Sequence, residues 1–121
     1  MPDTDEVLGG LLDQWKSGID AHDPRAVSSV FTDDAIFQGL RPFTVGPEGV
    51  FDYYDSQPVG MTVDYRILES RRLSDNAALG YVAATFAFPD RAAVELRLGV
   101  VVTKGSNDWQ IAYYQASPAP A

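Results

Sequence analysis

The 121-residue sequence contains no cysteine and only one histidine, His22, which narrows the chemistry available to it. Without cysteine there is no disulfide, no thiolate nucleophile and no cysteine-based metal site. A Ser-His-Asp triad would have to converge on His22, and no serine lies in a G-x-S-x-G pattern. The oxygen ligands near His22, which are Asp23, Asp33 and Asp34, are explained as helix caps and turn formers. We therefore expect no metal site and no cofactor.

Basic residues and long apolar runs are also scarce. Nine Lys and Arg stand against seventeen Asp and Glu, for a net charge of −8, and the basic residues are scattered. Nucleic-acid binding needs clustered positive charge, so we expect no nucleic-acid partner. No apolar run approaches the roughly 20 residues that span a bilayer, and the first six residues are acidic where a signal peptide would be basic. We expect a cytoplasmic protein with no membrane partner.

The first half of the chain predicts three helices within one domain, residues 1–121. Apolar residues recur at spacings of three and four near the N-terminus, and Asp23-Pro24 and Gly46-Pro47 are helix starts. Gln57-Pro58 ends the last helix, because the residue before proline avoids helical geometry. The expected helices are 3–20, 24–31 and 47–56, with a short strand over Ala35–Gln38.

The second half predicts a four-stranded meander over residues 61–116. From Met61 the apolar period changes to two, and short turns separate the runs, so neighbouring strands must be antiparallel. The predicted fold class is α+β, with three N-terminal helices on one face of a curved antiparallel sheet. The expected strands are Thr62–Arg71, Ala77–Phe88, Ala92–Lys104 and Trp109–Ala116.

Two of these strands are apolar on both faces. In Ala92–Lys104, Leu96 and Leu98 lie on one face and Val101 on the other. Helices can cover only one side of the sheet. We therefore expect a second copy of the chain to cover the other side, which makes the protein a homodimer.

Five stretches in order resemble the nuclear-transport-factor-2-like superfamily, specifically its SnoaL-like and SgcJ/EcaC-like members. They are WKSGIDAHDPRAVSSVFTDDAIFQG, VGPEGVFDYYDSQP, DYRILESRRL, GYVAATFAF and WQIAYYQAS. This resemblance implies a cone-shaped curved antiparallel sheet, three helices on its concave face, an internal apolar pocket and a dimer through the convex face. Fold alone does not imply a reaction.

The resemblance also places the ketosteroid-isomerase machinery on this chain, with a negative result. The hydrogen-bonding tyrosine falls on Trp15, the general-base aspartate on Gly39 and the oxyanion-hole aspartate on Gly99. A glycine can neither take nor share a proton. We expect no ketosteroid isomerisation.

Candidate ligand-binding residues are aromatic, with two charged additions. The aromatic candidates could line an apolar cavity, although their default role is core. Glu95 and Arg97 share a face of their strand with Gly99. The resemblance implies that this face points toward the inside of the cone, where Arg97 would be the polar anchor of the ligand. Periodicity alone favours the opposite orientation, with both charges in water. The aromatic set is Trp15, Phe37, Tyr54, Tyr81 and Tyr114.

The hypothesis that these observations favour is a homodimeric protein that binds a small hydrophobic molecule in an apolar internal pocket, with no recognisable catalytic set. The alternative is an enzyme of bacterial secondary metabolism, an isomerase, cyclase or oxidation-linked catalyst acting on a polyketide-like or steroid-like substrate. A third possibility, a pure oligomerisation module, predicts a filled core. A proton-transfer group inside the cone would separate the first two.

Overall fold

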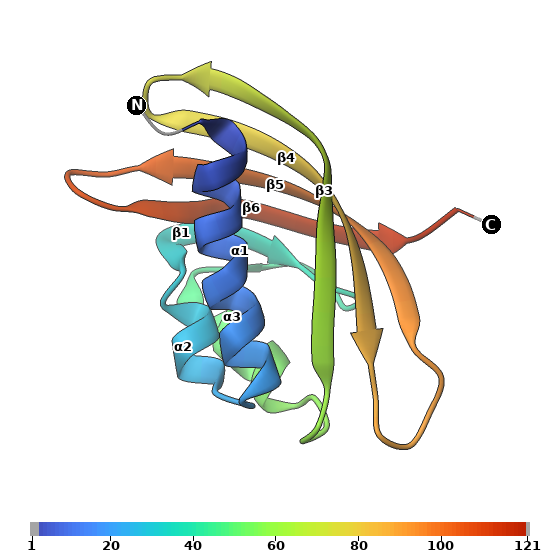
Figure 1. Ribbon diagram of the computed structural model, residues 1–121. Coiled ribbons are helices and arrows are strands. Elements are labelled where there is room, and N and C mark those ends of the chain that lie inside the picture. The colour runs from blue at the N-terminus through green and yellow to red at the C-terminus, as the bar shows by residue number, and fades with distance from the viewer. Residues whose placement is uncertain (1–2, 121) are drawn as a thin grey trace.

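The computed structural model describes residues 3–120, in which three helices pack against one face of a curved six-stranded sheet (Figure 1). The strands lie in the order β2-β1-β6-β5-β4-β3, and the sheet bends around the helices without closing. The predicted α+β class is confirmed. The elements are α1 (Thr4–Asp20), α2 (Pro24–Ser28), β1 (Phe31–Gln38), β2 (Thr44–Val45), α3 (Pro47–Asp55), β3 (Thr62–Ser74), β4 (Ala77–Ala87), β5 (Val94–Lys104) and β6 (Trp109–Pro118).

Side-chain caps start the first two helices, as their sequences predict. The Asp3 carboxylate accepts from the Glu6 N–H at 2.9 Å before α1, and the Asp23 carboxylate accepts from the Ala26 N–H at 3.1 Å before α2. The third helix begins after Gly46, whose φ of 93° favours glycine. Within residues 3–120, no helix combines the length and apolar character needed to cross a membrane.

The second helix is shorter than predicted, ending at Ser28 instead of residue 31. The Ser28 hydroxyl donates to the Arg25 carbonyl at 3.0 Å, and the Ser29 hydroxyl to the Ala26 carbonyl at 2.7 Å. Such bonds compete with the helical pattern. Phe31 instead begins β1, which is therefore longer than the expected strand over 35–38.

The predicted meander is confirmed, and two pairings extend the sheet beyond it. Strands β3 to β6 pair antiparallel in chain order. Strand β1 pairs with β6 in parallel, with Ile36 opposite Tyr113, and the short β2 pairs with β1. These additions extend the concave surface beneath α3.

Alternate residues of each strand fall on opposite faces of the sheet. On β5, Leu96, Leu98 and Val100 are at most 4% exposed and face the helices. The residues between them lie on the convex face, which no helix covers. This alternation decides which candidate residues can reach the interior.

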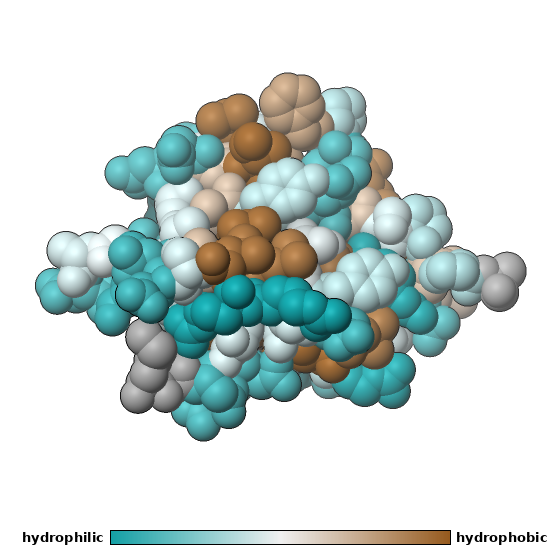
Figure 2. Space-filling view, turned by 90° about the horizontal axis from the view of Figure 1, so that it is seen from above, coloured by the Kyte–Doolittle hydropathy of each residue, from teal (hydrophilic) through white to brown (hydrophobic). Residues whose placement is uncertain are grey.

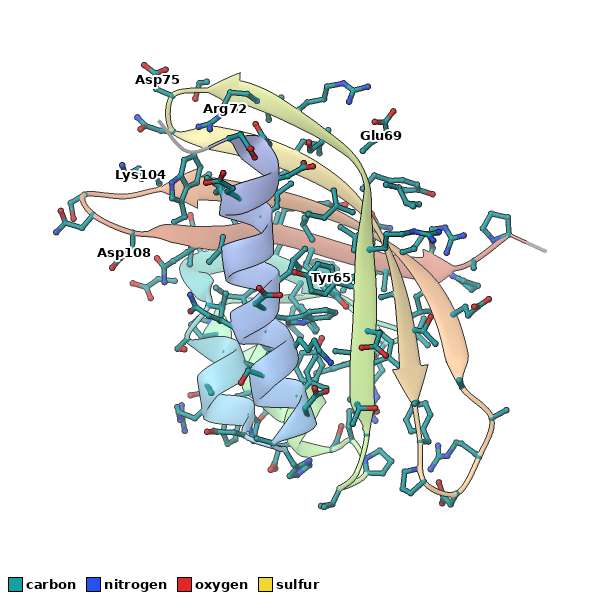
Figure 3. All side chains as sticks on the ribbon, in the orientation of Figure 1. Tyr65, Glu69, Arg72, Asp75, Lys104 and Asp108 are labelled. Atoms are coloured by element: carbon teal, nitrogen blue, oxygen red, sulfur yellow. The ribbon has the colours of Figure 1, made fainter. Side chains whose placement is uncertain are left out.

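Polar contacts anchor α1 to the edge strand β3. The Asp20 carboxylate accepts from the Val63 N–H at 3.0 Å, and Lys16 Nζ donates to the Val63 carbonyl at 2.6 Å. Further along, the Tyr65 hydroxyl donates to the Asp13 carboxylate at 2.6 Å. Figure 3 shows Tyr65 between β3 and α1, whereas Glu69 on the same strand points away from the helices. These contacts fix α1 against the edge strand of the open sheet.

Candidate functional site at the open end of the cone

Four of the seven predicted site residues converge inside the cone. Trp15 from α1, Phe37 from β1, Tyr54 from α3 and Tyr114 from β6 are each at most 3% exposed. The rings of Phe37 and Tyr114 stack with centroids 4.9 Å apart, and those of Trp15 and Tyr114 lie 6.0 Å apart. The four side chains form one aromatic cluster that fills the interior.

The cluster contains hydrogen-bonding groups that stay protonated. Trp15 Nε1 donates to the Tyr54 hydroxyl at 3.1 Å. Burial raises the pKa of Tyr54, and burial, followed by the neighbouring Tyr54 hydroxyl, raises the pKa of Tyr114 well above its ordinary value. At neutral pH these phenols can donate or accept hydrogen bonds, but they cannot serve as bases.

No carboxylate or imidazole joins the cluster. In the described part of the chain, Ser28 is the only buried polar side chain apart from the tyrosines and tryptophans. His22 lies outside the cone, in the corner between α1 and α2 with a φ of 49°. The described residues also contain no group of three or more His, Cys, Asp or Glu side chains placed to hold a metal ion.

Glu95 and Arg97 lie on the convex face, so the orientation that the resemblance implies for them is wrong. Leu96 between them and Leu98 after them are buried against the helices, at 4% and 0% exposed. The helices cover the face that carries the longer aliphatic side chains, because burying leucine is favourable and burying an unpaired charge is not. Arg97 Nη1 donates to the adjacent Leu96 carbonyl at 3.3 Å, and no ion pair to Arg97 occurs within residues 3–120. With Asp64 and Arg66 of β3, Glu95 and Arg97 border a shallow convex hollow of about 270 Å³.

Tyr81 also lies on the convex face, contrary to its predicted place among the aromatic candidates. It is 46% exposed and sits opposite Gly99 on β5. A side chain built at Gly99 would meet nothing within 4 Å, which shows that position 99 faces open space. Tyr81 and Gly99 therefore do not line the interior.

A small hollow opens between the end of α3 and the β4–β5 hairpin; we call it the mouth hollow. Its volume is about 60 Å³, room for a few water molecules, whereas ligand sites commonly occupy roughly 300 to 1,000 Å³. The ligand-sized cavity predicted inside the cone is thus replaced by packed rings beneath a small opening. The mouth hollow is lined by Leu40, Tyr53, Gln57, Met61, Phe86, Phe88, Val94, Leu96 and Tyr114.

Tyr53 is the rim residue that sequence reasoning missed. Gly39 is buried, and a Cβ built there would lie 2.3 Å from Tyr53 Cζ. The Tyr53 ring therefore occupies the space into which a side chain at position 39 would extend. A tyrosine beside Tyr54 and a glycine in a loop gave no local signal, because their meeting depends on how α3 packs on β1.

The comparisons with known proteins rest on structure alone, because no protein-family model matches the sequence and no curated protein matches it significantly. An NTF-2 like protein of unknown function from Shewanella oneidensis MR-1 is 17% identical with a TM-score of 0.81, over 93% of this chain and 97% of that one. A ketosteroid isomerase-like protein from Erwinia carotovora atroseptica is 23% identical with a TM-score of 0.76, over 96% of each chain.

A third solved structure, a scytalone dehydratase-like protein from Novosphingobium aromaticivorans, is 10% identical with a TM-score of 0.79, over 95% of this chain and 83% of that one. The identities are low, so these matches concern the fold and not the activity. With its three helices on the concave face of an open curved sheet, the chain has the cone-shaped fold of the nuclear-transport-factor-2-like proteins.

Proposed function

We propose that the protein is a homodimer that binds a small, flat and mostly apolar molecule at the mouth hollow. The observation that carries the binding proposal is the composition of that hollow. Phe86, Phe88 and Leu96 form an apolar wall, and Tyr53 and Gln57 place polar atoms at the rim. A concave apolar surface with a few convergent polar groups is the usual form of a small-molecule site.

The size of the hollow limits its occupant. At about 60 Å³ it admits part of one aromatic ring, with the remainder of the ligand lying across the rim. The ring would rest against Tyr114, whose own ring stacks on Phe37 at 4.9 Å. Stacking and displacement of water from the apolar wall would supply the affinity.

The side chains buried inside the cone favour ligand binding over proton-transfer catalysis. Among the buried side chains of residues 3–120, none is a carboxylate or an imidazole. Burial raises the pKa values of Tyr54 and Tyr114, so both phenols remain neutral at physiological pH. Groups of this kind orient a carbonyl or hydroxyl without removing a proton.

The test of the binding site is to fill the hollow. In ¹⁵N-labelled protein, ethylbenzene titrated to its solubility limit should shift the amide signals of the residues around the mouth hollow. Val94→Trp should abolish these shifts, because the larger ring would occupy the same space. Val45→Trp, at an exposed position on β2, is the matched control. Shifts that persist unchanged in Val94→Trp would overturn the proposed site.

The dimer proposal rests on an apolar row across the convex face. The pairing register places Ile36, Tyr113, Val101 and Leu79 side by side on four neighbouring strands. Ile36 and Leu79 are 44% and 38% exposed. Figure 2 looks down on this side of the molecule and shows hydrophobic residues at its centre with hydrophilic residues beside them. An exposed apolar patch rimmed by polar residues is typical of a protein interface.

A second copy of the chain fits this row, because a two-fold axis would lay the row against itself. Specific interfaces bury on the order of 1,600 Å² in total. Light scattering at micromolar concentration should give twice the chain mass of 13.2 kDa. Val101→Asp should return the monomer mass, and Val59→Asp, in an exposed loop, should not. A wild-type protein of 13.2 kDa would overturn the dimer.

A further inference from the structure

The Tyr53 hydroxyl at the rim of the mouth hollow owes its position to Gly39, which has no side chain to occupy the same space. A Cβ at Gly39 would lie 2.5 Å from Tyr53 Oη and 2.3 Å from Tyr53 Cζ, so only glycine at position 39 lets the phenol lie there. The Tyr53 phenol of α3 thus lies where the residue after β1 would otherwise project a side chain.

Contacts on three sides hold the Tyr53 ring in this place. Its centroid is 5.2 Å from Phe37 and 5.0 Å from Tyr54, both edge to face. The Arg41 guanidinium lies 5.6 Å from the ring centroid. The Leu40 N–H donates to the hydroxyl at 3.1 Å. A group fixed in this way loses little freedom when it binds a ligand.

The hydroxyl still has a proton to donate. Its hydrogen bond with Leu40 uses it as an acceptor, and no described side chain or carbonyl accepts its O–H. Two neighbouring polar groups already make hydrogen bonds within the protein. Gln57 Nε2 donates to the Tyr53 carbonyl at 3.4 Å, and the Tyr54 hydroxyl accepts from Trp15 Nε1 at 3.1 Å.

We propose that the Tyr53 hydroxyl is the hydrogen-bond donor that selects ligands of the mouth hollow, and that the ligand class is a small aryl ketone or aldehyde. The aromatic ring lies on the apolar wall, and the carbonyl oxygen accepts from Tyr53 Oη. The Leu40 N–H, by donating to the same hydroxyl, polarises it and strengthens its donation. This inference rests on the proposed binding site.

The experiment compares two probes of nearly equal shape, acetophenone and ethylbenzene, which differ by one carbonyl oxygen. Both are titrated by ¹⁵N chemical-shift perturbation into the wild type and into Tyr53→Phe, which keeps the ring. Acetophenone affinity should fall about threefold to tenfold in Tyr53→Phe, the range expected for one neutral hydrogen bond, while ethylbenzene affinity stays unchanged. Tyr81→Phe, the same change on the convex face, should leave both affinities as they were.

Gly39→Ala supplies a second variant, because the added methyl group must displace the Tyr53 ring. It should weaken acetophenone more than ethylbenzene, as Tyr53→Phe does. Equal losses for the two probes in Tyr53→Phe, or no loss for either, would overturn the role of the hydroxyl while leaving the site intact. If neither probe shifts the amides around the hollow in the wild type, the proposed site itself fails and this inference fails with it.

Discussion

The two faces of the sheet show that apolar character alone does not bury a residue in this molecule; the residue must also lie on the face that the helices cover. On β5, Val100 and Val102 are at most 1% exposed, while Val101 between them lies on the uncovered side. On β4, Val82 is fully buried and its neighbour Tyr81 is 46% exposed. The strands present apolar groups in both directions, and three helices bury only one set.

The comparison also separates the kinds of chemistry available on each face. The concave face carries neutral aromatic hydroxyls in a packed interior, whereas charged groups such as Arg97 and Glu95 stand on the convex face. Charges in water are not desolvated, so they need no partner there. Under the proposed function, a ligand at the mouth hollow would meet aromatic rings and a phenol hydroxyl, and a second copy on the convex face would meet aliphatic groups beside charges.

The largest expected effect is on the concave side, at Trp15. Trp15→Ala should lower the free energy of unfolding by about 3 to 5 kcal/mol, because it removes a fully buried indole and leaves a cavity among Phe86, Tyr54 and Tyr114. Urea unfolding measures the loss. Trp109→Ala, which removes the same ring from a half-buried position near Arg72, should have a much smaller effect. Equal losses would show that the concave interior is not the main core.

The next largest effect on the free energy of unfolding is expected at Leu98, which we compare with its neighbour Arg97 on β5. Leu98→Ala should destabilise by about 2 to 5 kcal/mol, because Leu98 is fully buried. Arg97→Ala should stay within about 0.5 kcal/mol of the wild type and should not change acetophenone affinity. Urea unfolding and the probe titration check both expectations. A large loss with Arg97→Ala would mean that the convex charge takes part in folding or binding.

The parts of the fold that could be predicted from the sequence are those determined by residues close together in the chain. The spacing of apolar residues and the Asp3 and Asp23 caps identify α1 and the start of α2, and the change to period two marks the meander. The parallel pairing of β1 with β6 could not be predicted, because it joins Ile36 to Tyr113 across most of the chain. The end of α2 depended on two serine hydroxyls that compete with the helix.

The site was predictable only in part for a related reason. Trp15 and Tyr114 could be assigned to the interior because large rings on a helix stripe or strand are usually buried. For Arg97, periodicity alone favoured water, and the resemblance argued for the opposite phase; the structure agrees with periodicity. Tyr53 could not be found from the sequence, because its place depends on the missing side chain of Gly39.

A smaller effect concerns how stability depends on pH at the aromatic cluster. Burial raises the pKa of Tyr54 above its ordinary value of 10.0. Above pH 10 the unfolded phenol therefore ionises while the folded one keeps its proton. The free energy of unfolding should then fall as pH rises, by about 1.4 kcal/mol per pH unit for one such tyrosine.

Tyr54→Phe should make this decline shallower, whatever its effect on stability at pH 8. Urea unfolding of wild type and variant at several pH values between 8 and 11 measures the two slopes. Tyr114→Phe should act in the same direction, because burial raises the pKa of Tyr114 as well. Identical slopes in all three proteins would show that the interior admits water and lets these phenols ionise.

The smallest effect separates two carboxylates that share Lys16. Its Nζ lies 2.8 Å from Asp20 and 3.2 Å from Asp64, whose side chains are 32% and 90% exposed. Asp20 also accepts from the Val63 N–H, and its loss would leave that donor unpaired at the junction of α1 and β3. Asp20→Ala should therefore destabilise by about 1 kcal/mol, while Asp64→Ala should stay within about 0.5 kcal/mol, since water and salt screen the exposed pair. Urea unfolding at low and high salt measures both variants. Comparable losses would mean that exposed charge at the sheet edge supports the fold as much as contacts on the covered side do.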